Sequence, residues 1–297
     1  MIGSKKKVLM TGATGFLGSN LLRELIKQKY EITILKRSFS NVDRIRDQIE
    51  FVKFFNIDKN SLKDIFKEIS ADVILHCATS YGRADKDPFA VIDANLMLPL
   101  KLLEIGKKNH IKYFLNTDTI LSKRINYYAL SKSQFKDWLE MYSDELVCIN
   151  VLLEHFYGAF DDRTKFVSFI IDKLLTNAVE IDLTEGKQKR NFIYIDDVVG
   201  AFIKVLENLD NFKFGIYNYE IGADKSYEIR DVVELIKKIS GNSLTKFNFG
   251  AIPYRKNEIM DSKADTEAIR SLGWKPKYSI IQGLTKTIHE EKGLRAP

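Results

Sequence analysis

Residues 11–18, Thr11-Gly12-Ala13-Thr14-Gly15-Phe16-Leu17-Gly18, decide the fold of this chain. Their three evenly spaced glycines separate a short apolar stretch from a stretch with leucines at helical spacing. One glycine permits a tight turn, a second lets the main chain approach a ligand, and a third lets helix and strand pack closely. The start of the helix then offers unpaired N–H groups and a positive dipole end to phosphates. This segment therefore predicts a strand, a turn and a helix that bind a dinucleotide.

Strand-like and helix-like stretches alternate through the first half of the chain. Apolar runs typical of buried strands are Lys7–Thr11, Glu31–Leu35, Phe51–Phe55, Val73–Cys77 and Tyr113–Leu115. Between them, apolar residues recur at helical spacing, as at Leu17, Leu21, Leu22, Leu25 and Ile26, and again at Leu62, Ile65, Phe66 and Ile69. This alternation predicts an α/β fold in which helices cover both faces of a parallel sheet. The expected architecture is a doubly wound, Rossmann-type sheet.

The second half of the chain mixes short strands and helices in a less regular order. Strands are expected at 179–183, 192–195, 216–219 and 244–249, and helices near 165–176, 197–208, 227–239 and 280–291. We interpret this half as a smaller C-terminal α+β lobe that binds the substrate. The predicted domains are 1–155 for the dinucleotide and 156–297 for the substrate, interleaved and without a Pro-rich linker.

Composition and charge exclude several classes of protein. The chain has 297 residues with a formal net charge of +6, but its lysines are spread out and form no basic helix, so we expect no nucleic-acid partner. No apolar run approaches the roughly 18 residues needed to span a bilayer. Lys5–Lys7 is followed by only Val8–Met10 before the turn, so no signal peptide is predicted. Cys77 and Cys148 lie in apolar runs without metal-ligand spacing, so we expect a cytoplasmic enzyme without a structural metal.

The spacing Gly-x-x-Gly-x-x-Gly resembles that of the short-chain dehydrogenases, especially their extended branch. In such proteins, an Asp or Glu after the second strand holds the ribose of NAD, but here Lys36-Arg37-Ser38 follows. A carboxylate there would repel a 2′-phosphate, whereas a guanidinium or ammonium group pairs with it. The sequence therefore favours NADP(H) as the cofactor. The simpler alternative is that Lys36-Arg37-Ser38 is only a solvent-exposed strand end with no role in cofactor binding.

Tyr128-Ala129-Leu130-Ser131-Lys132 is a YxxxK sequence whose tyrosine and lysine share one helix face. A lysine cation beside a tyrosine favours the phenolate and brings the tyrosine pKa toward neutral pH. Its place after the fifth strand resembles that of the family's catalytic pair, and Thr117 matches the family's Ser/Thr position. The implied catalytic residues are Thr117, Tyr128 and Lys132. Tyr127 is the rival tyrosine, but its fourth neighbour is Ser131.

The resemblance also implies the wider cofactor site. In the family, the residue matched by Asp58 contacts the adenine amino group, and the lysine of the pair holds the nicotinamide ribose. The implied cofactor contacts are Gly12, Thr14, Gly15, Phe16, Leu17, Gly18, Arg37, Ser38, Ile57, Asp58, Ala78, Tyr128, Lys132 and Leu153.

Four later segments narrow the resemblance. Leu153-Glu154-His155-Phe156-Tyr157-Gly158 stands where most extended members have R-x-x-N-V-Y-G-P, so that Leu152 replaces arginine and Ala159 replaces proline. Together with 186–198, 249–258 and 272–276, this segment is similar to the CDP-abequose and CDP-paratose synthases of bacterial O-antigen pathways. Sugar-nucleotide 4,6-dehydratases instead have Thr-Asp-Glu where this chain has Thr117-Asp118-Thr119, so dehydration is not expected.

This similarity implies NADPH-dependent reduction of the C4 ketone of a CDP-4-keto-3,6-dideoxyhexose. The implied substrate contacts are Tyr81, Thr117, Thr119, His155, Phe166, Arg190 and Arg255. The simpler interpretation of Arg190 and of Arg255 is a surface ion pair. The simpler interpretation of His155 is a histidine in the protein core. A sugar-nucleotide 4-epimerase and a non-catalytic NADP-binding regulator remain alternatives. The base and the product stereochemistry stay open.

The family also forms dimers through the helix near 88–108 and the helix that carries the YxxxK sequence. By resemblance we expect a homodimer, with Phe135, Trp138 and Leu139 contributing apolar surface.

Overall fold

The computed structural model describes residues 6–82 and 87–293. By their contacts, the residues divide into two compact units. The first unit comprises Met1–Leu153 together with Phe202–Glu220, and the second comprises Glu154–Ala201 together with Ile221–Pro297. Along the chain, part of the second unit is thus inserted between two parts of the first. Among the described residues, no helix is long and apolar enough to cross a membrane.

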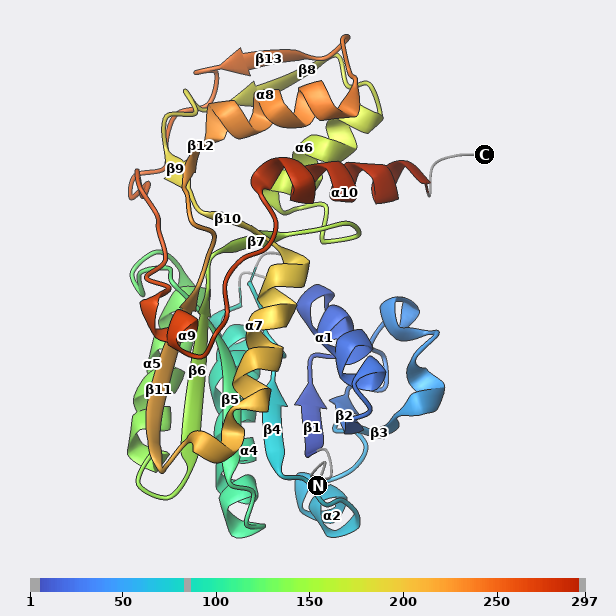
Figure 1. Ribbon diagram of the computed structural model, residues 1–297, viewed down its shortest axis with the longest axis vertical. Helices are drawn as coiled ribbons and strands as arrows, with labels where there is room; N and C mark the ends of the chain where they lie inside the picture. Colours follow the sequence, from blue (N-terminus) through green and yellow to red (C-terminus); the bar gives the residue numbers. More distant parts are fainter. Residues whose placement is uncertain (1–5, 83–86, 294–297) are drawn as a thin grey trace. The chain divides into compact units, whose positions relative to one another are not determined.

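The first unit contains a seven-stranded sheet in the order β11-β6-β5-β4-β1-β2-β3 (Figure 1). Its strands are β1 (Lys7–Thr11), β2 (Glu31–Lys36), β3 (Lys53–Asn56), β4 (Val73–His76), β5 (Tyr113–Thr119), β6 (Val147–Leu153) and β11 (Gly215–Ile221). The pairings from β3 across to β6 are all parallel. The chain order reverses beside the central β1, which confirms the predicted doubly wound Rossmann fold.

Apolar helix faces cover this sheet. The helices are α1 (Phe16–Lys27), α2 (Leu62–Glu68), α3 (Pro88–Ile92), α4 (Leu98–Lys108) and α5 (Tyr127–Tyr142), with a π-helical segment at Asp93–Met97 and short 3-10 turns at Asp43–Ile45, Ile49–Phe51 and Leu209–Asn211. On one face, Leu103 of α4 and Phe135 and Leu139 of α5 pack in one core with Phe114 of β5. The central strands β4, β5 and β6 are buried on both faces, as a parallel sheet requires.

The second unit contains three two-stranded sheets and several helices. The strand pairs are β7 (His155–Tyr157) with β10 (Phe192–Tyr194), β8 (Glu180–Leu183) with β13 (Lys246–Phe249), and β9 (Lys189–Arg190) with β12 (Tyr227–Glu228). The helices are α6 (Phe166–Leu175), α7 (Ile195–Glu207), α8 (Ile229–Ser240), α9 (Glu267–Ser271) and α10 (Ile280–Gly293). Helix α7 begins in this unit and continues into the first.

Two expectations differ from the structure. The strand predicted at 216–219 is part of β11, which pairs with β6 at the edge of the main sheet and not within the smaller lobe. A local apolar pattern indicates a strand but does not specify its partner. Phe135 and Leu139 are fully buried in the core of the first unit, so they offer no surface for a dimer, whereas Trp138 on the same helix is 42% exposed.

Candidate functional site

The glycine turn after β1 is a compact backbone cradle. Gly12 has a φ of 71°, and a Cβ atom on it would lie 2.4 Å from the Ala78 nitrogen. A Cβ on Gly18 would lie 2.0 Å from the Gly12 oxygen. Gly15 is exposed and precedes α1 without a side-chain cap. The backbone amides of the first turn, at a positive dipole end, fit the pyrophosphate of a dinucleotide.

At the end of β2, Ser38 is bonded to Asp58. The Ser38 backbone N–H donates to Asp58 Oδ1 over 2.7 Å, and its hydroxyl donates to Oδ2 over 2.5 Å. The hydrogen bond from the Ser38 hydroxyl is the main reason why the pKa of Asp58 is lowered. The Arg37 guanidinium is exposed, with its carbon 4.7 Å from the centre of the Phe39 ring. Ile57 follows β3 here, and its backbone N–H donates to the Lys36 carbonyl over 2.9 Å.

The structure joins two of the three predicted catalytic residues directly. Lys132 Nζ donates to the backbone carbonyl of Thr117 over 2.8 Å, which ties α5 to the end of β5. The Lys132 side chain is fully buried, and this burial lowers its pKa from 10.5 to about 8, against an opposing effect of the Asp118 charge. The Thr117 hydroxyl donates to the His76 carbonyl over 3.1 Å.

Tyr128 lies in the first turn of α5, one helical turn before Lys132. The Asn126 side chain caps this helix by accepting from the Ala129 N–H over 2.8 Å. The centre of the Tyr128 ring lies 4.9 Å from that of Tyr81. The segment after β4 therefore brings a second tyrosine to the predicted proton donor.

A residue that the sequence analysis missed connects these parts. Asn95, fully buried in the π-helical segment, donates through Nδ2 to the Ser80 carbonyl over 2.8 Å and to Ser131 Oγ over 3.0 Å. Its Oδ1 accepts from the Ser80 N–H over 2.7 Å and from the Thr79 hydroxyl over 3.1 Å. Asn95 thus fixes the loop that carries Tyr81 against α5. The available signal was an amide side chain among the mostly apolar residues 88–100.

Asp118 is held by a buried polar chain across β5 and β6. Asn116 Nδ2 donates to Asn150 Oδ1, and Asn150 Nδ2 donates to Asp118 Oδ2, both over 2.7 Å. Asp118 Oδ1 accepts from the Thr119 N–H over 2.7 Å. The Asp118 carboxylate is therefore oriented by amides within the sheet. Thr119, the predicted substrate contact, is the last residue of β5 and is only partly buried.

In the second unit, two of the predicted substrate residues flank the same aromatic ring. His155 lies opposite Phe192 in the β7–β10 pair, with ring centres 6.0 Å apart. The Phe166 ring stacks on Phe192 with centres 6.4 Å apart and planes inclined by 25°. His155 and Phe166 therefore belong to one cluster. The preceding residue, Glu154, was not predicted as a site residue, although its carboxylate bonds to His155.

The two predicted arginines are linked through one loop. Arg190 forms an ion pair with Glu258, and its Nη1 donates to the carbonyls of Lys189 and Ile259. Arg255 lies in the same loop and is exposed, and its carbonyl accepts from the Glu258 N–H over 3.0 Å. The guanidinium of Arg190 therefore already has an anionic partner within its own unit.

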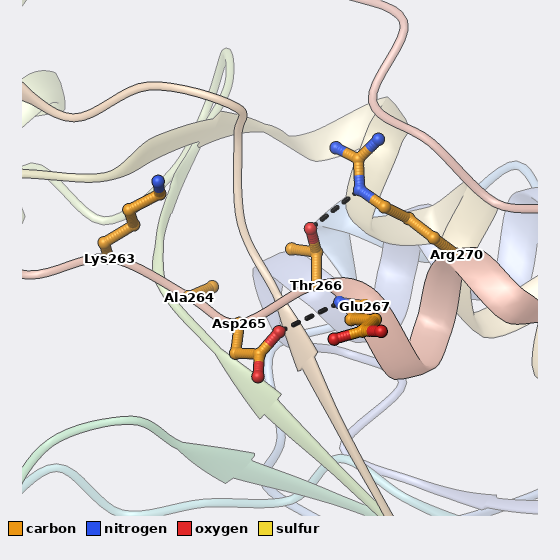
Figure 2. A pocket seen from close by; sticks show the side chains of 6 residues that line it. All are labelled: Lys263, Ala264, Asp265, Thr266, Glu267 and Arg270. Carbon is orange, nitrogen blue, oxygen red and sulfur yellow. Dashed lines mark hydrogen bonds between the residues drawn. The ribbon is translucent and has the colours of Figure 1, made fainter.

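A surface pocket lies elsewhere in the second unit (Figure 2). It is lined by Lys263, Ala264, Asp265, Thr266, Glu267 and Arg270. Its polar groups bond to each other, since Arg270 Nε donates to the Thr266 hydroxyl over 2.8 Å and the Glu267 N–H donates to Asp265 Oδ1 over 3.0 Å. None of the predicted site residues lines it. Among the described residues, no cluster of His, Cys, Asp or Glu side chains is arranged to hold a metal ion.

Comparison with known proteins places these features in a family. Residues 8–222 match the profile of the NAD dependent epimerase/dehydratase family. A CDP-abequose synthase of Salmonella muenchen is 38% identical to this chain, covering 97% of it and 99% of the relative. A second CDP-abequose synthase, of Salmonella typhimurium, is 32% identical, with coverages of 96% and 98%. Among solved structures, the UDP-glucose 4-epimerase of Thermotoga maritima with UDP-glucose superposes with a TM-score of 0.85 at 22% identity, covering 98% of this chain and 100% of that one.

Proposed function

Because this chain belongs to the NAD dependent epimerase/dehydratase family, we propose that it is an NADPH-dependent reductase of a nucleotide-linked 4-keto-deoxyhexose. The favoured substrate is CDP-4-keto-3,6-dideoxyglucose, whose C4 ketone is reduced to give CDP-abequose or CDP-paratose for surface polysaccharide. The names of the two Salmonella relatives support this substrate class. One observation supports the reductase chemistry. Lys132 Nζ donates a hydrogen bond to the Thr117 carbonyl, and Lys132 lies one helical turn after Tyr128 on α5.

The first unit has the residues to hold the dinucleotide. The amides after Gly15 are suited to the pyrophosphate, and the exposed Arg37 is assigned to a 2′-phosphate. Because the Ser38 hydroxyl is engaged with the Asp58 carboxylate, Arg37 is the residue expected to decide between NADP and NAD. Asp58, which is bonded to Ser38, and Ile57 are assigned to the adenine. Ala78, which follows β4, and Leu153, at the end of β6, are assigned to the remaining cofactor contacts. Bound in its reduced form, the cofactor supplies the hydride.

Three residues are assigned to the transfer of a proton to the C4 oxygen of the substrate. Tyr128 donates its hydroxyl proton to the oxygen that develops negative charge at C4. Since the pKa of Lys132 is about 8, its ammonium form dominates at pH 7 and stabilises the phenolate that remains. Thr117 turns its hydroxyl from the His76 carbonyl toward the substrate oxygen and fixes its position. Placing these groups in advance, where negative charge develops, is the main catalytic effect.

The remaining contacts recognise the sugar nucleotide. Tyr81 and Thr119 of the first unit are assigned to the sugar, as are His155 and Phe166 of the second. Arg190 and Arg255, joined through the loop at Glu258, are assigned to the diphosphate. Trp138, exposed on α5, contributes to a homodimer interface.

The test is oxidation of NADPH, followed by its absorbance, with enzymatically prepared CDP-4-keto-3,6-dideoxyglucose. We expect rapid turnover with NADPH and the CDP sugar, and much slower turnover with NADH or a dTDP-4-keto-6-deoxy sugar. Turnover with only the dTDP sugar would keep the reaction but refute the CDP assignment. Tightly bound NAD in the purified protein, with no net consumption of reductant, would instead support the 4-epimerase alternative.

A further inference from the structure

Two amide side chains and one carboxylate form a polar row between β5 and β6, made of Asn116, Asn150 and Asp118. Asn116 and Asn150 are paired in the sheet register and are completely buried, and Asp118 is 5% exposed. Asn116 Nδ2 donates to Asn150 Oδ1, and Asn150 Nδ2 donates to Asp118 Oδ2, both over 2.7 Å. The Thr119 backbone N–H donates to Asp118 Oδ1 over 2.7 Å. Each carboxylate oxygen therefore accepts a short hydrogen bond from a neutral N–H group.

The order of donors and acceptors in the polar row fits an ionised Asp118. A protonated carboxyl has an O–H that needs an acceptor, whereas the described contacts of Asp118 are N–H donors on both oxygens. The row is also kept at a cost. Asn116 Oδ1 is buried and has no hydrogen-bond partner among residues 6–82 and 87–293. The sequence thus leaves one buried acceptor unpaired while it orients Asn150 toward the carboxylate, and the row holds a negative charge at the end of β5.

The cation nearest to this charge along the fold is Lys132. Its Nζ donates to the carbonyl of Thr117, the residue before Asp118, over 2.8 Å. Burial lowers the pKa of Lys132 to about 8, and the negative charge of Asp118 acts against this decrease. His76 and Cys77, at the end of β4, are the other titratable neighbours. Burial lowers the pKa of His76 well below its ordinary value and raises that of Cys77 to about 12, so both are neutral at pH 7.

We propose that Asp118, held by Asn150 and Asn116, is a positioning residue that keeps the buried Lys132 in its ammonium form. The inference rests on the proposed function for the role of Lys132 beside Tyr128, one helical turn away on α5. A neutral amine would lack the charge that stabilises the Tyr128 phenolate, so turnover would fall. Because both Asp118 oxygens are already bonded, the carboxylate acts through Lys132 and not on the substrate.

The first test is titration of Lys132 in the cofactor-free full chain, followed by NMR of isotope-labelled lysine side chains. Lys132→Met identifies the signal. We expect Asp118→Asn to move the midpoint of this titration to lower pH, since the ammonium loses its anionic neighbour. In turnover of the keto-sugar with NADPH, the same variant should lose about threefold or more at pH 8 and stay within about twofold of native at pH 6, where the ammonium persists in both proteins. Asp137→Asn, which alters an exposed carboxylate of the same helix, is the matched control and should change neither result.

A double variant separates the position of the charge from the hydrogen bonds. Asp118→Asn combined with Asn150→Asp exchanges amide and carboxylate, so every donor of the polar row still faces an oxygen. The negative charge then lies on β6, about 5 Å further across the sheet and away from β4. We expect the double variant to regain in urea unfolding most of the stability that Asp118→Asn loses. Its Lys132 midpoint should stay shifted to lower pH, and its loss of turnover at pH 8 should remain.

Several outcomes would overturn the inference. A native Lys132 midpoint in both variants would refute it. A midpoint that shifts in Asp118→Asn but returns to native in the double variant would assign the effect to the hydrogen bonds and not to the charge. A shifted midpoint with the native pH dependence of turnover would refute the positioning role. If the midpoint shifts in both variants while the native protein reduces no keto-sugar, the link between Asp118 and Lys132 is supported and the proposed function fails.

Discussion

The two units assemble their candidate sites in different ways. In the first unit, the glycine turn lies within residues 11–18, and Tyr128 and Lys132 lie one turn apart on a single helix. In the second unit, Glu154 meets Ser262 across 108 residues, and Arg190 meets Glu258 across 68. A site contained in one strand, turn or helix leaves a motif in the sequence. A site assembled from distant partners does not, because its geometry is set by tertiary packing.

The largest effect is expected from a substitution that tests whether Tyr128, in the first unit, donates the proton. We expect Tyr128→Phe to lower single-turnover reduction by about 10²–10⁴-fold, since it removes the general acid. Binding of NADPH and of CDP should remain within about threefold of native, because Tyr128 is one of many implied cofactor contacts and is not among those assigned to the sugar nucleotide. Near-native single-turnover rates would remove Tyr128 from the mechanism, and the first unit would then have no assigned proton donor.

The second prediction separates function from stability within the first unit. Burial lowers the pKa of Lys132 from 10.5 to about 8, so the folded state carries an unfavourable buried cation. The destabilisation is fully present below pH 8 and disappears as the pH rises past 10.5, where the unfolded lysine also loses its proton. A difference of about 2.5 pKa units corresponds to about 3 kcal/mol.

Lys132→Met should therefore abolish turnover yet raise the free energy of unfolding of the cofactor-free protein at pH 7 by up to about 3 kcal/mol, less the loss of the bond to the Thr117 carbonyl. Urea unfolding at pH 7 and at pH 10 measures this gain, which should shrink at the higher pH. An equal or larger gain at pH 10 would contradict the assigned cause.

The smallest effect concerns the choice of cofactor. We expect Arg37→Ala to weaken NADPH binding by about tenfold through the loss of one charge-assisted contact, with NADH binding unchanged. Arg46→Ala, which removes another exposed arginine of the same unit, is the control. Fluorescence titration with the two cofactors measures both. If NADPH and NADH weaken together, Arg37 acts on a part of the cofactor that both share.

Features set by local sequence were predicted correctly, whereas features set by tertiary packing were not. The strand predicted at Lys7–Thr11 and the helix after the glycine turn occur where expected, because local spacing specifies both. The prediction that the strand at 216–219 belongs to the smaller lobe was wrong. This strand, β11, pairs with β6, and the partner of a strand is set by long-range packing. The family resemblance assigned Phe135 and Leu139 to a dimer surface, but it could not show that both side chains pack in the core of the first unit. The roles of the site residues remain predictions.

The division of the first unit into two stretches of chain also constrains how the protein is made. Synthesis proceeds from the N-terminus, so strands β1 to β6 leave the ribosome before Phe202–Glu220 exist. Until β11 arrives, β6 is an open edge with unpaired backbone groups, a known template for aggregation. The nascent sheet must therefore wait until Glu154–Ala201 of the second unit has been made. A fragment ending at Leu153 would contain every predicted catalytic residue and still lack the strand that closes its sheet.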